Sequence, residues 1–162
     1  MAEYHDPRDQ FISNPLTVTD LQEDWRILEI IHDEWFDFDD IRFSSEDGVV
    51  TIPFNRADHT FNARTVRQGF LSRTIEVDVV RSILTIKHVR TFSVDDRAQI
   101  GGARFNKFSL NDSRLVIDCT PDCILAMHVS DFEMMIHDQE IRGKARRDIG
   151  WFWDSGPGKL IE

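Results

Sequence analysis

The sequence predicts a mainly β protein of the α+β class, with one domain and one N-terminal amphipathic helix. We expect seven to eight short antiparallel strands, arranged as a curled sheet, a sandwich or a partly open barrel. Three observations lead to this prediction. The chain has 162 residues, a length typical of one domain. Short apolar runs and turn signals alternate over residues 41–137, and only residues 19–34 show the period of a helix.

The N-terminal third is expected to hold an irregular arm, residues 1–18, followed by the helix at 19–34. Thr19 is a plausible N-cap, and Gln22 three residues later completes a capping-box pattern. The apolar positions recur at helical spacing along one stripe, which consists of Leu21, Trp25, Leu28, Ile31 and Trp35.

The strands are expected to begin with a hairpin, in which residues 41–43 and 49–54 flank a turn at Asp47-Gly48. Residues 55–72 show neither period and predict a long loop. Residues 142–162 are a tail, which either stays irregular or adds a last strand. The further strands are expected at 73–80, 83–94, 103–110, 114–119, 123–129 and 131–137.

An internal similarity links two of these strand regions. His88 and His128 lie 40 positions apart, and each begins the pattern His-Val-x-x-Phe. Strand-rich sequences also produce such matches by chance, so duplication of a hairpin and coincidence both remain open.

The net charge of −10 is unevenly distributed. Residues 1–60 hold 15 acids and 4 bases, whereas residues 61–130 hold 7 acids and 10 bases. The excess is densest over residues 23–47. Such a region is either a solvated face or a docking surface for a basic partner or a cation. We predict a non-catalytic binding protein whose partner-binding residues are Asp33, Glu34, Asp37, Asp39 and Asp40.

A second hypothesis is a small metal-dependent hydrolase. On a strand, Asp131, Glu133 and His137 share one face, and His128 lies just before them. The same pattern is typical of the wet side of a half-buried strand. The chain has no nucleophile elbow and no phosphate-binding glycine loop, so we predict no catalytic residue and no cofactor.

A third hypothesis is a structural subunit of a homo-oligomer, joined through an exposed sheet edge and the apolar residues Trp151–Trp153. A basic run from Arg142 to Arg147 precedes these aromatics, a combination that can bind nucleic acid or a membrane surface. The acidic balance of the whole chain argues against both, so we expect neither partner.

The N-terminal residues are polar and show no apolar segment of a secretory signal, which predicts a cytoplasmic protein. In that compartment Cys119 and Cys123 would stay reduced. Their spacing around Thr120-Pro121-Asp122 is typical of a tight hairpin, in which they form a structural pair, a cross-strand disulfide or a redox pair.

The segment Ile31-His32-Asp33, the pattern Phe38-x-x-Ile41-x-Phe43, the hairpin strand 49–54 and the later Val-x-x-Phe strand resemble a broad set of small bacterial proteins. These proteins open with a His-Asp pair before the first sheet strand. Some of them are similar to immunity proteins that act against polymorphic toxins. The resemblance implies stoichiometric neutralisation of a basic toxin by an acidic surface, without catalysis.

Overall fold

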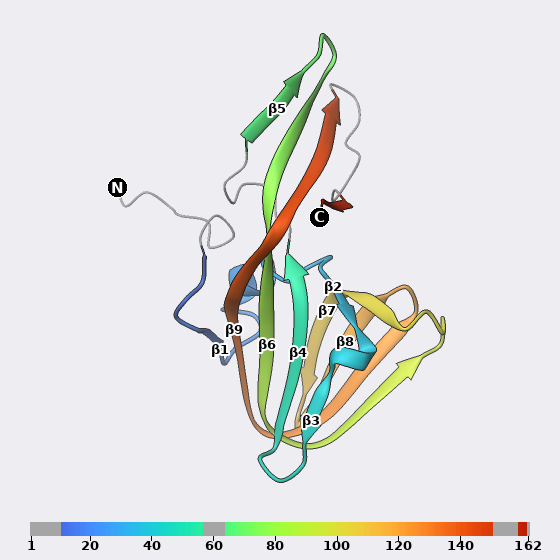
Figure 1. Cartoon of the computed structure of the whole chain (residues 1–162). Coiled ribbons are helices and arrows are strands. Elements are labelled where there is room, and N and C mark those ends of the chain that lie inside the picture. Colours follow the sequence, from blue (N-terminus) through green and yellow to red (C-terminus); the bar gives the residue numbers. More distant parts are fainter. Residues whose placement is uncertain (1–10, 57–63, 151–158, 162) are drawn as a thin grey trace.

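The computed structural model describes residues 11–56, 64–150 and 159–161 (Figure 1). It confirms a mainly β protein: all ten strands belong to a single sheet, and every pairing is antiparallel. The strands are β1 (Leu16–Val18), β2 (Trp35–Asp37), β3 (Arg42–Ser44), β4 (Val49–Arg56), β5 (Arg64–Gln68), β6 (Ser72–Asp96), β7 (Gly102–Asn111), β8 (Arg114–Thr120), β9 (Cys123–Gly150) and β10 (Lys159–Ile161). The helical elements in the described residues are one α-helical turn, α1 (Trp25–Leu28), and one 3-10 turn, η2 (Phe38–Asp40).

The sheet closes partly into a ring. Its neighbours run in the order β9, β8, β7, β2, β4 and β6, and β6 also pairs with β9. Inside the ring lies the main hydrophobic core, to which each of these strands contributes fully buried side chains such as Phe36, Phe54, Phe105, Ile117 and Leu125. The ring therefore encloses packed side chains, and we call it the body of the molecule.

Two long strands, β6 and β9, bend together at one corner of the ring. Val89 pairs with Val129 there, and His88 has a positive φ of 58°. On one side of this corner residues 72–87 of β6 pair with residues 133–150 of β9, and on the other side residues 89–96 of β6 pair with residues 123–129 of β9. The two His-Val segments that resemble each other in sequence therefore lie side by side at this corner, on antiparallel strands.

The outer ends of β6 and β9 leave the body as a ribbon, which β5 widens (Figure 1). We call residues 64–80 and 141–150 the arm. A small second core lies within it, formed by Ile75, Val77, Val79 and Ala145. The arm therefore has apolar packing of its own and does not depend only on backbone hydrogen bonds.

A buried carboxylate joins three strands of the arm. Glu76 on β6 forms ion pairs with Arg64 on β5 and with Arg146 on β9, where Nε lies 3.1 Å from Oε2. Lys144 Nζ lies 3.6 Å from the same carboxylate. Hydrogen bonds from Arg64 and then Arg146 hold the pKa of the Glu76 carboxyl below its usual value.

Glu76→Gln is expected to loosen the arm at neutral pH, and the difference from the wild-type chain should shrink in acid. A carboxyl with a lowered pKa in the folded state stabilises above its unfolded pKa, near 4.5, and this contribution is lost as the pH falls through the folded pKa. Hydrogen exchange of the Val77 and Ala145 amides in both proteins, compared at each pH, measures the difference. Glu140→Gln, an exposed change on the paired strand β9, is the control. Equal protection of the Glu76→Gln and wild-type arms at neutral pH would contradict the prediction.

The predicted helix at 19–34 is wrong, because only Trp25–Leu28 is α-helical. The Asp20 carboxylate accepts the N–H groups of residues 22 and 23, and the Asp24 carboxylate accepts those of residues 19 and 20. Such local bonds stabilise turns in place of a helix. After α1 the chain enters the core, where the neighbours Ile30 and Ile31 are both fully buried, and Trp35 begins β2.

The predicted boundaries need further corrections. The segment 1–18, which was expected to be irregular, contains β1 in its described part. The expected loop at 55–72 contains the end of β4 and the whole of β5, and its residues 57–63 lie outside the described part of the chain. Strands expected at 73–80 and 83–94 are one strand, as are those at 123–129 and 131–137. The expected tail begins as the end of β9, and β10 follows it. Irregular pairing at Arg81/Ser82 and Lys87/Val89 bends β6 without ending it.

The predicted hairpins agree with the structure. Gly48 takes a positive φ of 65° between β3 and β4, as the Asp47-Gly48 signal requires. Cys119 pairs with Cys123 across the turn between β8 and β9, and both thiols are free and buried. Burial raises the pKa of both thiols, that of Cys123 to about 11. No helix within the described ranges is long and apolar enough to cross a membrane.

Candidate functional site

The predicted partner-binding residues lie on a short segment that includes β2, one strand of the ring. β2 pairs with β7 on one side and with β4 on the other. Its alternation turns Phe36 into the core and leaves Asp37 exposed. Before β2, the N–H of Asp33 donates to the carbonyl of Phe105 over 2.8 Å, and the N–H of Phe105 donates to the carbonyl of Glu34 over 3.1 Å. These bonds fix the acidic segment to the ring.

A close approach of two backbones holds this segment in place. A Cβ atom added to Gly102 on β7 would lie 2.5 Å from Trp35 Cζ2 and 2.7 Å from the carbonyl oxygen of Phe36. The glycine therefore allows β2 and its indole to lie directly against β7. Asp37, which pairs with Gly102, takes its position from the same contact.

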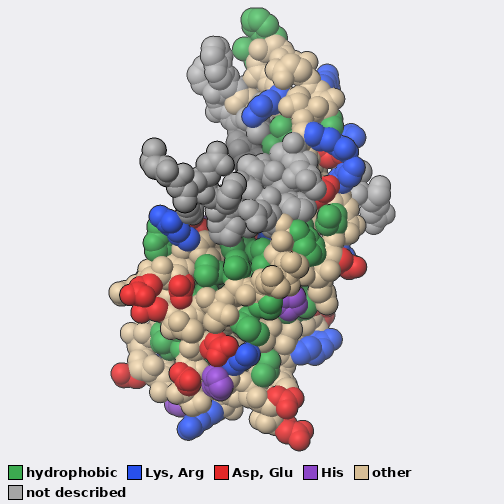
Figure 2. Space-filling view, turned by 90° about the vertical axis from the view of Figure 1, so that its left-hand side faces the viewer, with side chains coloured by type: hydrophobic (Ala, Val, Ile, Leu, Met, Phe, Trp, Pro, Cys, Tyr) green, Lys and Arg blue, Asp and Glu red, His purple; other side chains and the backbone are tan. Residues whose placement is uncertain are grey.

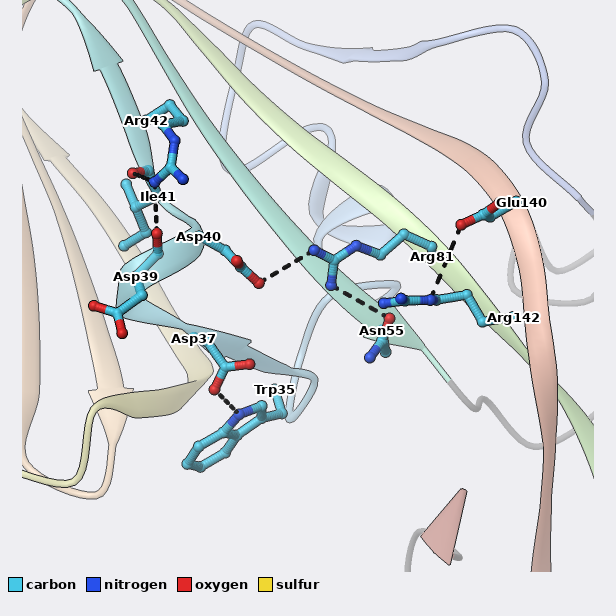
Figure 3. A network of polar contacts seen from close by, with 10 residues as sticks. All are labelled: Trp35, Asp37, Asp39, Asp40, Ile41, Arg42, Asn55, Arg81, Glu140 and Arg142. Atoms are coloured by element: carbon cyan, nitrogen blue, oxygen red, sulfur yellow. Dashed lines mark hydrogen bonds and ion pairs between the residues drawn. The ribbon is translucent and has the colours of Figure 1, made fainter. Parts of the chain in front are cut away.

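The carboxylates of the segment have different partners (Figure 3). Asp37 Oδ1 accepts a hydrogen bond of 2.9 Å from Trp35 Nε1. Asp40 forms an ion pair of 3.2 Å with Arg81, which reaches across from β6. Arg42 donates to the carbonyl of Asp39, whose carboxylate points away from this network in Figure 3.

The two remaining predicted residues lie before β2. The exposed Asp33 carboxylate lies 3.2 Å from His32 Nδ1, and Glu34 is half-buried. Arg104 on β7 donates to the carbonyl of Asp33 over 2.8 Å. All five predicted residues thus lie on one continuous segment, but nearby arginines offset part of its negative charge. Asp33, Asp37 and Asp39 are its exposed carboxylates.

One apolar side chain belongs to this segment, and a second lies next to a residue that is hydrogen-bonded to it. Trp35 is half-buried, with the Arg104 guanidinium 6.0 Å from its ring centroid. Ile100 is 57% exposed and precedes Gly101, whose carbonyl accepts the N–H of Phe38. We call the five predicted residues together with Trp35 and Ile100 the acidic face. The sequence analysis assigned Trp35 to a helix stripe and did not include Ile100, which follows a polar turn and carries no periodic signal.

The residues of the hypothetical metal site do not form a cluster. Glu133 binds Lys87 Nζ at 3.1 Å and lies 3.9 Å from His88 Nε2. His128 pairs with Arg114 on β8, whereas His137 pairs with Ile83 on β6, and Asp131 is exposed between them. Within the described part of the chain, no group of three or more His, Cys, Asp or Glu residues is arranged to hold a metal ion.

A buried ion pair that the sequence analysis did not identify lies where the arm leaves the body. Arg56 and Asp138 are both essentially inaccessible, and Arg56 Nε and Nη2 donate to the two Asp138 oxygens at 3.1 and 2.5 Å. Ser82 Oγ donates to Oδ1 over 2.5 Å, and the Ile12 N–H donates to Oδ2 over 2.7 Å. This network joins β4, β6, β9 and the N-terminal segment, so its role is structural.

Comparison of the chain with protein-family models, with curated proteins and with solved structures found no match.

Proposed function

We propose that this chain is a non-catalytic interaction protein that docks a basic protein partner on the acidic face. The observation that carries the proposal is the combination of exposed carboxylates, Asp37 and Asp39, with the apolar side chains of Trp35 and Ile100. Stable interfaces combine a desolvated apolar centre with a charged rim. The resemblance to immunity proteins supports the same kind of role, stoichiometric binding of a basic toxin.

Electrostatics would act mainly on encounter in this mechanism. Carboxylates on one side of a small body attract a cationic partner and accelerate association, and salt weakens the effect. The ion pair between Asp40 and Arg81 already lies within the face, so Asp40 contributes less to attraction than Asp37 and Asp39 do.

Asp37→Lys with Asp39→Lys is expected to abolish capture of a basic partner from cell extract at low salt. The matched control is Asp131→Lys with Glu140→Lys, two exposed carboxylates on β9. Both variants change the net charge from −10 to −6, because each reversal adds two charges. A difference between them therefore reports the location of the charge. Equal capture by both variants and the wild-type chain would refute the proposal.

Association kinetics with the captured partner provide a second readout. The reversal at Asp37 and Asp39 should lower the association rate constant about tenfold or more at low salt and change the dissociation rate less. Ile100→Ser should instead accelerate dissociation, because it removes apolar contact area without changing charge.

A further inference from the structure

The tip of the arm exposes apolar side chains at its turn. The hairpin from β5 to β6 closes with a hydrogen bond of 2.7 Å from the Gly69 N–H to the carbonyl of Ser72. Between them, Phe70 is 100% exposed and Leu71 is 50% exposed, and Val66 on β5 is 42% exposed. In Figure 2, hydrophobic side chains form the upper end of the arm, with Lys and Arg side chains below them.

Hairpin turns are usually polar, since an exposed Phe gains nothing from folding. A contiguous apolar tip on a projecting ribbon is typical of a surface that is covered by a partner. The tip is also flanked by Arg67 and Arg73, both exposed. Its partner should therefore offer an apolar recess with acidic surroundings.

The charge of the chain divides between arm and body. The arm contains seven bases and three acids, a net charge of +4, so the other residues together carry −14. A polyanion such as nucleic acid that approached the arm would be repelled by the rest of the protein. A second copy of this chain would not be repelled, because the acidic body of the second copy complements the basic arm of the first.

The body carries a groove that fits the tip. Its cavity volume is about 410 Å³, and one wall is the turn at 19–22 while the other is the β7 segment 108–110. The lining is mixed, and its apolar residues Leu21, Phe108 and Leu110 also pack against the main core. Asp20 lines the groove, and the exposed Glu23 follows it. The volume, the apolar lining residues and the negative charge of the groove match Phe70 and Leu71 with their flanking arginines.

We propose that the arm tip of one copy docks in the groove at 19–22 and 108–110 of a second copy. The arm points away from its own body (Figure 1), so the contact forms between molecules. It joins two different surfaces, tip and groove, and is therefore head-to-tail. Such contacts build open chains, or closed rings where the rotation between copies allows it.

The contact is small, because it consists of one hairpin turn in one groove. Stable interfaces bury about 1,200–2,000 Å² in total, so self-association through the tip is expected to be weak and dependent on concentration. The average mass of the wild-type full chain, measured by light scattering during size-exclusion chromatography, should rise with the loading concentration.

Two variants separate the two sides of the contact. Phe70→Ser removes the tip residue and should leave the protein monomeric at every concentration. Gln22→Arg places a cation on the groove wall and should have the same effect, since Gln22 is exposed and lines the groove, where the added cation would repel the basic tip. Val94→Ser removes an exposed apolar side chain on the body, outside both the acidic face and the groove, and should associate like the wild-type chain.

Mixing the two variants that do not associate alone gives the decisive result. Phe70→Ser keeps an intact groove and Gln22→Arg keeps an intact tip, so a mixture should form one-to-one dimers and no larger species. A mixture of Phe70→Ser with Ser109→Arg, a change on the β7 side of the groove, should give the same one-to-one dimers.

Three outcomes would overturn the inference. The first is a wild-type chain that stays monomeric at every concentration, as it would if residues of the same chain covered the groove. The second is association that persists in Phe70→Ser, which would place the contact elsewhere. The third is a mixture that stays monomeric although the wild-type chain associates. None of these results depends on the acidic face, because Phe70 and Gln22 lie outside it.

Discussion

Asp138→Ala is expected to lower the free energy of unfolding by about 3–5 kcal/mol, the usual cost of breaking a buried ion pair by removing one of its members. Arg56 is 1% exposed, and its guanidinium faces both oxygens of Asp138. The same change removes the acceptor of the Ser82 hydroxyl and of the Ile12 N–H. Chemical denaturation of the wild-type and variant chains measures the loss.

Two further variants identify the cause. Asp138→Asn keeps the shape and an acceptor oxygen but removes the charge, so it should also be strongly destabilised. Arg56→Met combined with Asp138→Leu removes both charges and should be more stable than Asp138→Ala alone, because apolar side chains then replace both members of the buried pair. Asp131→Ala, an exposed carboxylate on the same strand, should change stability by less than about 0.5 kcal/mol. A loss in Asp138→Ala as small as this control would contradict the prediction.

The alternation of inward and outward residues along β4 and β9 explains why both members of this ion pair are buried. On β4, Val50, Ile52 and Phe54 face inward, and the next inward position is Arg56. On β9, Met134 and Ile136 face inward, and the next such position is Asp138. The period of two therefore places both charges inside. The sequence analysis ended this strand at residue 54 because residues 55–72 show neither period.

Long-range partners explain the other differences between prediction and structure. Arg81-Ser82 has the composition of a turn, yet Ser82 is fully buried because it donates to Asp138, which lies 56 residues away. The hairpins were predicted correctly because their signals are local, such as Asp47-Gly48. The pairing of β6 with β9 has no local signal, so neither the ring nor the arm could be derived from the sequence.

The acidic face was predictable in location but not in strength. Charge counting placed it within residues 23–47, and the structure places its carboxylates on one segment at β2. The arginines that offset them, Arg81 and Arg104, come from β6 and β7, which are distant in sequence. Trp35 fits the helical stripe in the sequence, but the turns at Asp20 and Asp24 compete with the helix and leave it to begin a strand.

Phe105→Ala is expected to cost about 3–5 kcal/mol, the range for removing a fully buried Phe from a core. Phe105 is 0% exposed and contacts three other rings inside the body. Its centroid lies 4.4 Å from that of Phe36, 5.6 Å from that of Phe54 and 6.1 Å from that of Phe108. Alanine would leave a cavity among rings from β2, β4 and β7 that the closed sheet cannot collapse to fill.

Phe108→Ala is the matched control, because Phe108 is the half-buried ring of the group and should lose less stability. Phe105→Leu should fall between the two, since it leaves a smaller cavity. The change also tests the acidic face, because the backbone of Phe105 holds Asp33 and Glu34. Faster hydrogen exchange of the Asp33 amide in Phe105→Ala than in Phe108→Ala, at matched overall stability, would show that the core ring positions this segment. Equal losses of stability in Phe105→Ala and Phe108→Ala would contradict the prediction.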